Sequence, residues 1–546
     1  MNDAPVTKPA PVPIAAPAKP TAPGKPPVLD CTADFAALRN LPRPERGPQR
    51  GQTSWPSGRY RFDSGQVVGY IYGRCYFADV AAAIKTATSA EHRVYIAGWW
   101  VQTDTQLLRQ RPDDPNKPLY LTDLVAASPA QIRSLTWKPL AAVAGAPNNQ
   151  PWVAFVNGLP QGAAVADAKL PVQIDDTGIR VGVHHQKIVV VVGELGTNAF
   201  LGGMDLNNTR THEGGVEPLH DVHLRLTGAP ATMVLKTFQE RWTDLPETAK
   251  LEVDKFKASP STPYVRAFPS SAPLATNVPT CTLPQGAKLD DRRVSVGRTY
   301  ADLRKFGGPA PYAFAPSGER TAEQMVVGAI RQARLIYLEE QYLTSKRIRL
   351  ELAARLRDKE FLFLLILMCN SDEIDPTEFR YLRVYRNEFR LDLTTADPAR
   401  ARWGMYSLSD TSDPNRRPFA GSYVHSKTWI FDDTYVITGS ANCTDRSFTF
   451  DTEIVAGVSE GGFVPRGPDA FATALRINLW HKHLGVPHNK IRTWTDGLKY
   501  WRNPPKTAMI YDNSQQENDP YLNAPFDPDD RDLTFWRNSY DTDGAK

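Results

Sequence analysis

The chain carries two copies of one set of reactive side chains. The later copy is His425-Ser-Lys427, followed by Asp432, Gly439-Ser440 and Asn442, and the earlier copy is His185-Gln-Lys187, followed by Val192, Gly202-Gly203 and Asp205. In each copy the histidine and lysine stand two residues apart in a run of strand-forming residues, so their side chains face one side of a strand. An imidazole can act as a nucleophile, and an ammonium group neutralises phosphate oxygens. The pattern predicts a phosphate site that contains a nucleophile.

Cleavage of a phosphodiester at such a site uses two histidines. A neutral imidazole attacks phosphorus and forms a covalent phosphohistidine, which replaces one difficult displacement by two easier ones. A second, protonated imidazole gives its proton to the departing alkoxide and then takes one from the incoming water or alcohol. Lys187 and Lys427 would neutralise the non-bridging oxygens. None of these roles needs a metal ion or another cofactor, and none is predicted.

The elements that must position these residues are repeated as well. The run Tyr95-Ile-Ala-Gly-Trp-Trp precedes His185 much as the run Tyr337-Leu-Glu-Glu-Gln-Tyr precedes His425. Each run follows apolar residues spaced as on one helix face, and the second helix begins with a predicted capping box of Thr321 and Gln324. A duplicated α/β unit is the simplest account. The apolar residues are Phe77, Val80, Ala81 and Ile84 in the first helix, and Met325, Val326, Ala329 and Ile330 in the second.

The predicted fold class is α/β, with two homologous lobes, each a mixed or largely parallel sheet flanked by helices, and the active site at their pseudo-two-fold interface. A chain of 546 residues exceeds what one core usually supports. The apolar run from Phe361 to Met368 is too short to cross a bilayer and predicts a buried parallel strand. The predicted domains are a Pro/Ala-rich, disordered extension over 1–50, a first lobe over 55–265, a second lobe over 266–500 and a C-terminal tail over 501–546.

The motif residues resemble those of the phospholipase D superfamily. The family pattern, His-x-Lys-x4-Asp-x6-Gly-Ser-x-Asn, is met in full from His425 to Asn442. The first copy is similar to the eukaryotic-type branch around His185, in Gly202-Gly-Met-Asp-Leu and in Leu219-His-Asp-Val-His, but it has Val192 where the family has Asp. The resemblance covers about residues 55 to 500, and a free-standing core with a Pro-rich extension is similar to bacterial members.

The resemblance implies roles for the motif residues. His185 would be the nucleophile and His425 the general acid. Asp221, 36 residues after His185, and Glu453, 28 residues after His425, would be the carboxylates that orient the imidazole of their own half and stabilise its charged form. The predicted rim around the substrate phosphate consists of Gly203, Asp205, Ser440 and Asn442, and the predicted wall of the pocket consists of Trp99, Trp100 and residues 337–342.

Other residues of these segments are expected to be structural. His184 lacks a lysine two residues later and is expected to pack beside the motif. His483 and its neighbours are expected at the surface. Asp432 is expected to be a structural carboxylate, which would make Val192 tolerable; the opposite hypothesis is that the first half has decayed.

The activity implied by the resemblance is that of a phospholipase D, which hydrolyses glycerophospholipids at a membrane surface to phosphatidic acid and a free head group, with transfer to alcohols as a further expectation. A nuclease of the same superfamily and a decayed phosphate-binding protein are the alternatives. The chain has 64 Lys and Arg residues and 60 Asp and Glu residues, so it lacks the excess of basic residues that is typical of nucleic-acid-binding proteins. No transmembrane segment and no oligomeric state are predicted. Residues 1–28 lack the apolar core of a Sec signal, so a cytoplasmic protein is expected, or an effector exported by another route.

Overall fold

The structure is a computed structural model of the chain. It describes residues 54–111, 114–139, 147–175, 178–211, 219–256, 291–306, 308, 310–369, 380–408, 423–460 and 470–513. The predicted N-terminal extension over 1–50 and residues 514–546 of the predicted tail lie outside the described residues.

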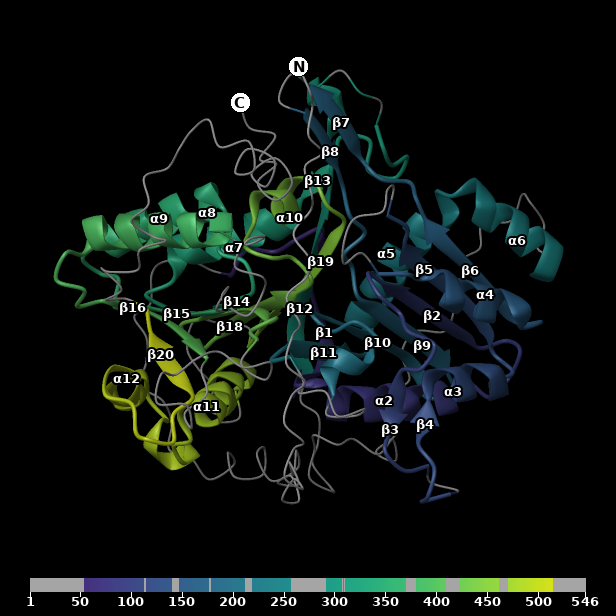
Figure 1. Ribbon diagram of the computed structural model, residues 1–546, viewed down its shortest axis with the longest axis horizontal. Coiled ribbons are helices and arrows are strands. Elements are labelled where there is room, and N and C mark those ends of the chain that lie inside the picture. The colour runs from purple at the N-terminus through teal and green to yellow at the C-terminus, as the bar shows by residue number, and fades with distance from the viewer. Residues whose placement is uncertain are drawn as a thin grey trace, which may run out of the picture.

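The elements of the first half alternate between strands and helices (Figure 1). They are β1 (Tyr60–Ile71), α2 (Gly73–Lys85), β2 (Arg93–Gly98), β3 (Gln106–Leu108), β4 (Leu119–Tyr120), α3 (Leu121–Ala127), β5 (Gln131–Trp137), α4 (Gln150–Gly158), β6 (Gly162–Asp167), β7 (Val172–Asp175), β8 (Gly178–Val181), β9 (Ile188–Gly193), β10 (Gly196–Gly202), the 3-10 helix η2 (Asn208–Arg210), β11 (Val222–Leu226), α5 (Ala229–Thr243) and α6 (Pro246–Phe256).

The second half repeats this alternation. Its elements are β12 (Asp291–Tyr300), η4 (Leu303–Phe306), β13 (Glu319–Arg320), α7 (Thr321–Gln332), β14 (Leu335–Glu340), α8 (Lys346–Arg357), β15 (Phe363–Met368), α9 (Arg380–Ala396), β16 (Trp403–Leu408), β17 (Lys427–Phe431), β18 (Tyr435–Gly439), α10 (Asp445–Thr449), β19 (Glu453–Ser459), α11 (Phe471–Leu484), η7 (His488–Lys490), α12 (Trp494–Arg502) and β20 (Ile510–Asp512).

One mixed sheet of 16 strands runs through both halves. The order β1-β11-β10-β9-β2-β5-β6 on one side is matched by β12-β19-β18-β17-β14-β15-β16 on the other, with β20 at the far edge and β13 paired to β12. In each half the outer three strands of these series are parallel and the others antiparallel. The antiparallel pair β1 and β12 joins the halves at the centre of the sheet (Figure 1). The duplicated α/β fold predicted from the repeat is therefore confirmed.

Helices cover the sheet on both faces because alternate strand residues are apolar on both sides. Ile188 and Val190 of β9 point into a core that also contains residues of α5, α11 and α12 and extends across both halves, while Val189 and Val191 point into a core with α2. The predicted helical faces are buried in α2 and α7, and β15 is the predicted parallel strand. The predicted capping box is wrong, since α7 begins after Arg320 without a side-chain cap and the Thr321 hydroxyl instead accepts a hydrogen bond from the Arg298 N–H.

The two halves differ where Asp432 stands in one and Val192 in the other. The Asp432 carboxylate lies in a turn beyond β17 and accepts hydrogen bonds from the backbone N–H groups of Arg334 and Leu335, at 2.8 and 2.7 Å, where β14 begins. Val192 is still inside β9, 3% exposed, and its backbone pairs with neighbouring strands on both sides. Because regular strand pairing continues at this position, the first half has no use for a carboxylate there.

Val192→Asp is expected to destabilise the fold, by roughly 3 kcal/mol or more, because it buries an unpaired charge among apolar side chains. The measurement is the urea midpoint, with Val192→Thr as a control of the same shape that carries no charge. An unchanged midpoint together with faster turnover in the Asp variant would mean that the first half is a damaged copy.

Candidate active site

The backbone around each motif histidine is held by the opposite half of the chain. The residue before His185 forms a parallel β-bridge with Thr452, and the residue before His425 forms one with His220. The His185 N–H donates to the Thr452 carbonyl at 3.0 Å, and the His425 N–H donates to the His220 carbonyl at 2.7 Å. These bridges bring the two histidines of the repeat to the interface between the halves.

Each imidazole is also paired with a carboxylate of the opposite half. Nδ1 of His425 lies 2.7 Å from Oδ2 of Asp221, and Nδ1 of His185 lies 3.0 Å from Oε1 of Glu453. Spacing along the chain predicts that each carboxylate pairs with the histidine of its own half, whereas in the structure the pairs are crossed between the halves. A carboxylate at Nδ1 fixes the ring and leaves Nε2 as the reacting nitrogen.

Two of the residues predicted for the phosphate rim contact these carboxylates instead. A Cβ atom at Gly203 would lie 2.1 Å from Oδ1 of Asp221, so only glycine allows the approach of that carboxylate. The Ser440 carbonyl lies 3.0 Å from Nδ1 of His185, and the Ser440 hydroxyl donates to Glu453. Gly203 and Ser440 therefore occupy equivalent places, one behind each carboxylate.

The two lysines are buried beside the histidines. Nζ of Lys187 lies 3.2 Å from Oδ2 of Asp205, and Nζ of Lys427 donates to Oε1 of Gln341 at 2.7 Å. Burial lowers the pKa of Lys187 and lowers the pKa of Lys427 to about 7. The negative charge of a bound phosphate would favour the charged form of both ammonium groups.

Asp205 and Asn442 occupy corresponding positions with different surroundings. Oδ1 of Asp205 accepts hydrogen bonds from the backbone N–H groups of Trp99 and Trp100, at 2.9 and 3.0 Å. Asp205 therefore holds both the loop after β2 and the ammonium group of Lys187 in place. Asn442 is 6% exposed, and its Oδ1 atom has no hydrogen-bond partner in the described part of the chain.

Arg210 is a residue of this site that the sequence analysis missed. Its Nη2 atom lies 3.4 Å from Nε2 of His425 and 3.8 Å from Oδ2 of Asp205, and its Nη1 atom lies 3.6 Å from Oδ2 of Asp221. The side chain is 3% exposed. The repeat gave no signal for it, because the corresponding stretch after Asn442 carries no basic residue at the same spacing.

Burial and the neighbouring cations set the protonation of the two imidazoles and of their carboxylates. Burial, followed by the charges of Lys187 and Lys427, holds the pKa of His185 well below its usual range. Burial, followed by the charge of Arg210, does the same to the pKa of His425. Burial also raises the pKa of Asp221 to about 6 and that of Glu453 to about 8. Both imidazoles are therefore neutral at pH 7 before an anion enters.

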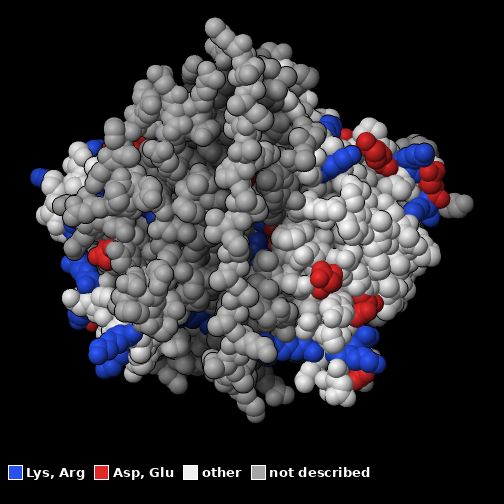
Figure 2. Space-filling view, viewed as in Figure 1, with Lys and Arg blue, Asp and Glu red and all other residues white. Residues whose placement is uncertain are grey.

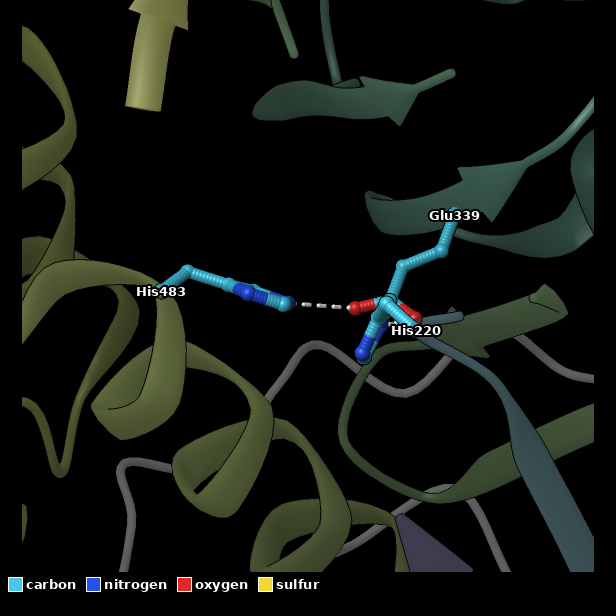
Figure 3. Close-up of side chains that lie close together, drawn as sticks. All are labelled: His220, Glu339 and His483. Carbon is cyan, nitrogen blue, oxygen red and sulfur yellow. Dashed lines mark hydrogen bonds and ion pairs between the residues drawn. The ribbon is translucent and has the colours of Figure 1, made fainter. Parts of the chain in front are cut away.

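His220, Glu339 and His483 form a second buried cluster (Figure 3), whose first member precedes Asp221 in the chain. His483 is fully buried, so its prediction as a surface residue is wrong. Oε1 of Glu339 is 2.8 Å from Nε2 of His483 and accepts from the Tyr337 hydroxyl at 2.6 Å, while Oε2 is 2.8 Å from Nε2 of His220. This hydrogen-bonded network ties α11 and β14 to the segment that carries Asp221.

The same cluster has the side-chain types that hold a divalent cation, two imidazoles and a carboxylate. The Nδ1 atoms of His220 and His483 have no partner within the described residues. A metal bound at both Nε2 atoms would force a buried proton onto each Nδ1 with no acceptor for it. The residues therefore fit a hydrogen-bonded clamp better than a metal site.

His184 is buried in a similar hydrogen-bonded network beside the other carboxylate, Glu453, in agreement with its expected packing role. Its Nε2 atom lies 3.1 Å from Oδ2 of Asp167, and its Nδ1 atom lies 2.9 Å from the Thr452 hydroxyl. The residue next to Thr452 is Glu453, so this contact holds the carboxylate that pairs with His185.

Comparisons with known proteins agree with the motif. A family model described as Phospholipase D matches residues 394–496. Phospholipase D alpha 1 of Nicotiana tabacum is 24% identical, over 76% of this chain and 64% of that protein, and phospholipase D alpha 3 of Arabidopsis thaliana is 25% identical, over 78% and 64%. The chain thus spans less than two thirds of the length of these relatives. A crystal structure of phosphatidylserine synthase from Haemophilus influenzae aligns with a TM-score of 0.48 and 13% identity, over 78% of this chain and 88% of that one.

Within the described ranges, every helix is too short or too polar to cross a membrane.

Proposed function

The chain belongs to the phospholipase D superfamily, and we propose that it hydrolyses glycerophospholipids to phosphatidic acid and a free head group through a covalent phosphohistidine. The observation that supports this most directly is the crossed pairing of the two motif histidines with Glu453 and Asp221. It leaves two Nε2 atoms, one from each half, to act on one phosphate.

In the first step Nε2 of His185, neutral before substrate enters, attacks phosphorus. The bond to the head-group oxygen breaks, and His425 donates a proton to that oxygen. The negative charge of the bound phosphodiester offsets the nearby cations, which raises the depressed pKa of His425 and lets it take up that proton. Asp221, 2.7 Å from Nδ1, stabilises the imidazolium.

In the second step His425, now neutral, takes a proton from water, and the hydroxide oxygen replaces His185 on phosphorus. Lys187 and Lys427 balance the charge on the non-bridging oxygens in both steps. Glu453 stabilises the positive charge that His185 carries in the intermediate, and phosphatidic acid leaves.

The assay that tests the proposal compares purified protein on phosphatidylcholine vesicles, phosphatidylethanolamine vesicles and DNA. Release of the head group with phosphatidic acid as the second product is the expected result. On the parts of this face that are not grey in Figure 2, Lys and Arg side chains lie among Asp and Glu side chains. Cleavage of DNA without cleavage of either lipid would replace the proposal with a nuclease.

A short primary alcohol is expected to divert the phosphatidylcholine reaction to the phosphatidyl-alcohol. The head group leaves before the acceptor arrives, so water and alcohol compete for the same phosphohistidine. Lipid products are separated and quantified at increasing alcohol, with a tertiary alcohol of equal carbon number as a steric control. Head-group release without any exchange product at high alcohol would contradict a free intermediate.

A further inference from the structure

Arg210 differs from the other buried arginines in what its guanidinium contacts. Arg225 holds Asp79 at 3.0 Å, and Arg241 holds Asp167 at 2.7 Å. For Arg210 the two carboxylates within reach are 3.6 and 3.8 Å away, which is too long for a direct hydrogen bond. The Nε and Nη1 atoms of Arg210 are buried and have no hydrogen-bond partner in the described ranges.

The contact that Arg210 does make is to a reacting atom. A guanidinium group only donates hydrogen bonds, so the 3.4 Å approach of Nη2 to Nε2 of His425 requires an unprotonated Nε2. The proposed general acid carries its proton on that same nitrogen. When Nε2 of His425 is protonated, it can no longer accept a hydrogen bond from Arg210. The N–H groups of Arg210 then need another acceptor.

We propose that Arg210 is a third cation for the substrate phosphate, which binds a non-bridging oxygen beside His425 and releases the Nε2 atom of that histidine for protonation. This inference rests on the proposed function. The planar guanidinium offers two adjacent N–H groups to a phosphate, which the ammonium groups of Lys187 and Lys427 cannot do. The first half supplies this group, whereas the arginine that follows Asn442 in the second half, Arg446, pairs with Asp451.

The simpler alternative is that Arg210 only neutralises Asp205, which stands where the second half has the uncharged Asn442. The double variant Asp205→Asn with Arg210→Gln separates the two roles. It removes one positive and one negative charge together and gives the first half the same amide as the second. Neutralisation alone would make this double variant bind anions like the wild type, whereas a phosphate-binding role would not.

The experiment is titration calorimetry of inorganic phosphate into the full-length wild type, Arg210→Gln, Asp205→Asn and the double variant, with a thermal melt of each. Arg210→Gln and the double variant are expected to bind phosphate about 10- to 100-fold more weakly than the wild type. Asp205→Asn alone is expected to bind at least as tightly as the wild type. If Arg210→Gln does not fold, Arg210→Lys keeps the charge but loses the paired donors, and weaker binding is again expected.

Equal phosphate affinity in the wild type and Arg210→Gln, including no binding by either, would overturn the inference, and so would recovery of wild-type affinity in the double variant. Because the titration contains no lipid, its result is separate from the test of the proposed function. If the wild type binds phosphate through Arg210 but cleaves no lipid, the proposed lipid substrate is wrong, and the role of Arg210 in binding phosphate is still supported.

Discussion

Alanine in place of either His185 or His425 is expected to lower phosphodiester turnover by about four to six orders of magnitude, and the double variant is expected to be little worse than either single one. Each proposed step needs His185 at phosphorus and His425 at the departing or attacking oxygen. The loss of either imidazole is therefore expected to stop the reaction. The measurement is the initial rate of choline release under saturating phosphatidylcholine. His481→Ala, which removes an imidazole outside the site, is the matched control.

Near-native hydrolysis in either single variant would contradict a two-histidine site. Losses that multiply in the double variant would mean that the histidines act independently, and the pseudo-two-fold arrangement would then have no catalytic meaning.

Asparagine in place of Asp221, or glutamine in place of Glu453, is expected to lower turnover by about two to four orders of magnitude. The amide keeps the shape of the side chain but cannot ionise to stabilise an imidazolium, and it can favour the wrong tautomer. Because the pairs are crossed, Asp221→Asn is expected to lower the rate constant for the first step through its effect on His425. Rapid-quench measurement of head-group release separates this step from breakdown of the intermediate.

The wild type is also expected to lose stability as pH rises, through a dependence on Glu453 that the glutamine variant lacks. Burial raises the pKa of Glu453 from 4.5 to about 8, so the folded state binds more protons than the unfolded state between these values, and stability falls as pH rises through that range. Glutamine cannot ionise, so Glu453→Gln is expected to gain melting temperature relative to the wild type between pH 5 and about pH 8. A difference in melting temperature that does not change with pH would contradict a protonated, buried Glu453.

The histidine and lysine pairs were predictable because their chemistry is local. The spacing of two residues is expected to put each histidine and its lysine on one face of a strand, but His185 and Lys187 lie just before β9, and His425 lies just before β17. The continuous apolar run that became β15, and the helical faces of α2 and α7, were predictable for the same reason: burial leaves a periodic pattern in the sequence.

The pairing of His185 with Glu453 was not predictable, because it depends on how the two halves dock. Spacing along the chain places Asp221 after His185, but the bridges at Thr452 and His220 exchange the carboxylates between halves. His483 was misplaced because burial of α11 on nearly all sides leaves no polar face that would distinguish a buried imidazole from an exposed one. Arg210 lies in a polar segment without periodicity, and only its approach to His425 reveals it.

The covalent phosphohistidine is tested most directly by mass spectrometry of a quenched reaction of His425→Asn with phosphatidylcholine. Without the general acid, formation and breakdown of the intermediate both slow, and breakdown also loses its base, so the adduct is expected to persist. The account predicts a phosphatidyl or phosphoryl group on His185, and no adduct in the matched variant His185→Asn. An adduct on His425 in the wild type would reverse the two roles, and head-group release by the wild type with no adduct on either histidine at any quench time would contradict the covalent mechanism.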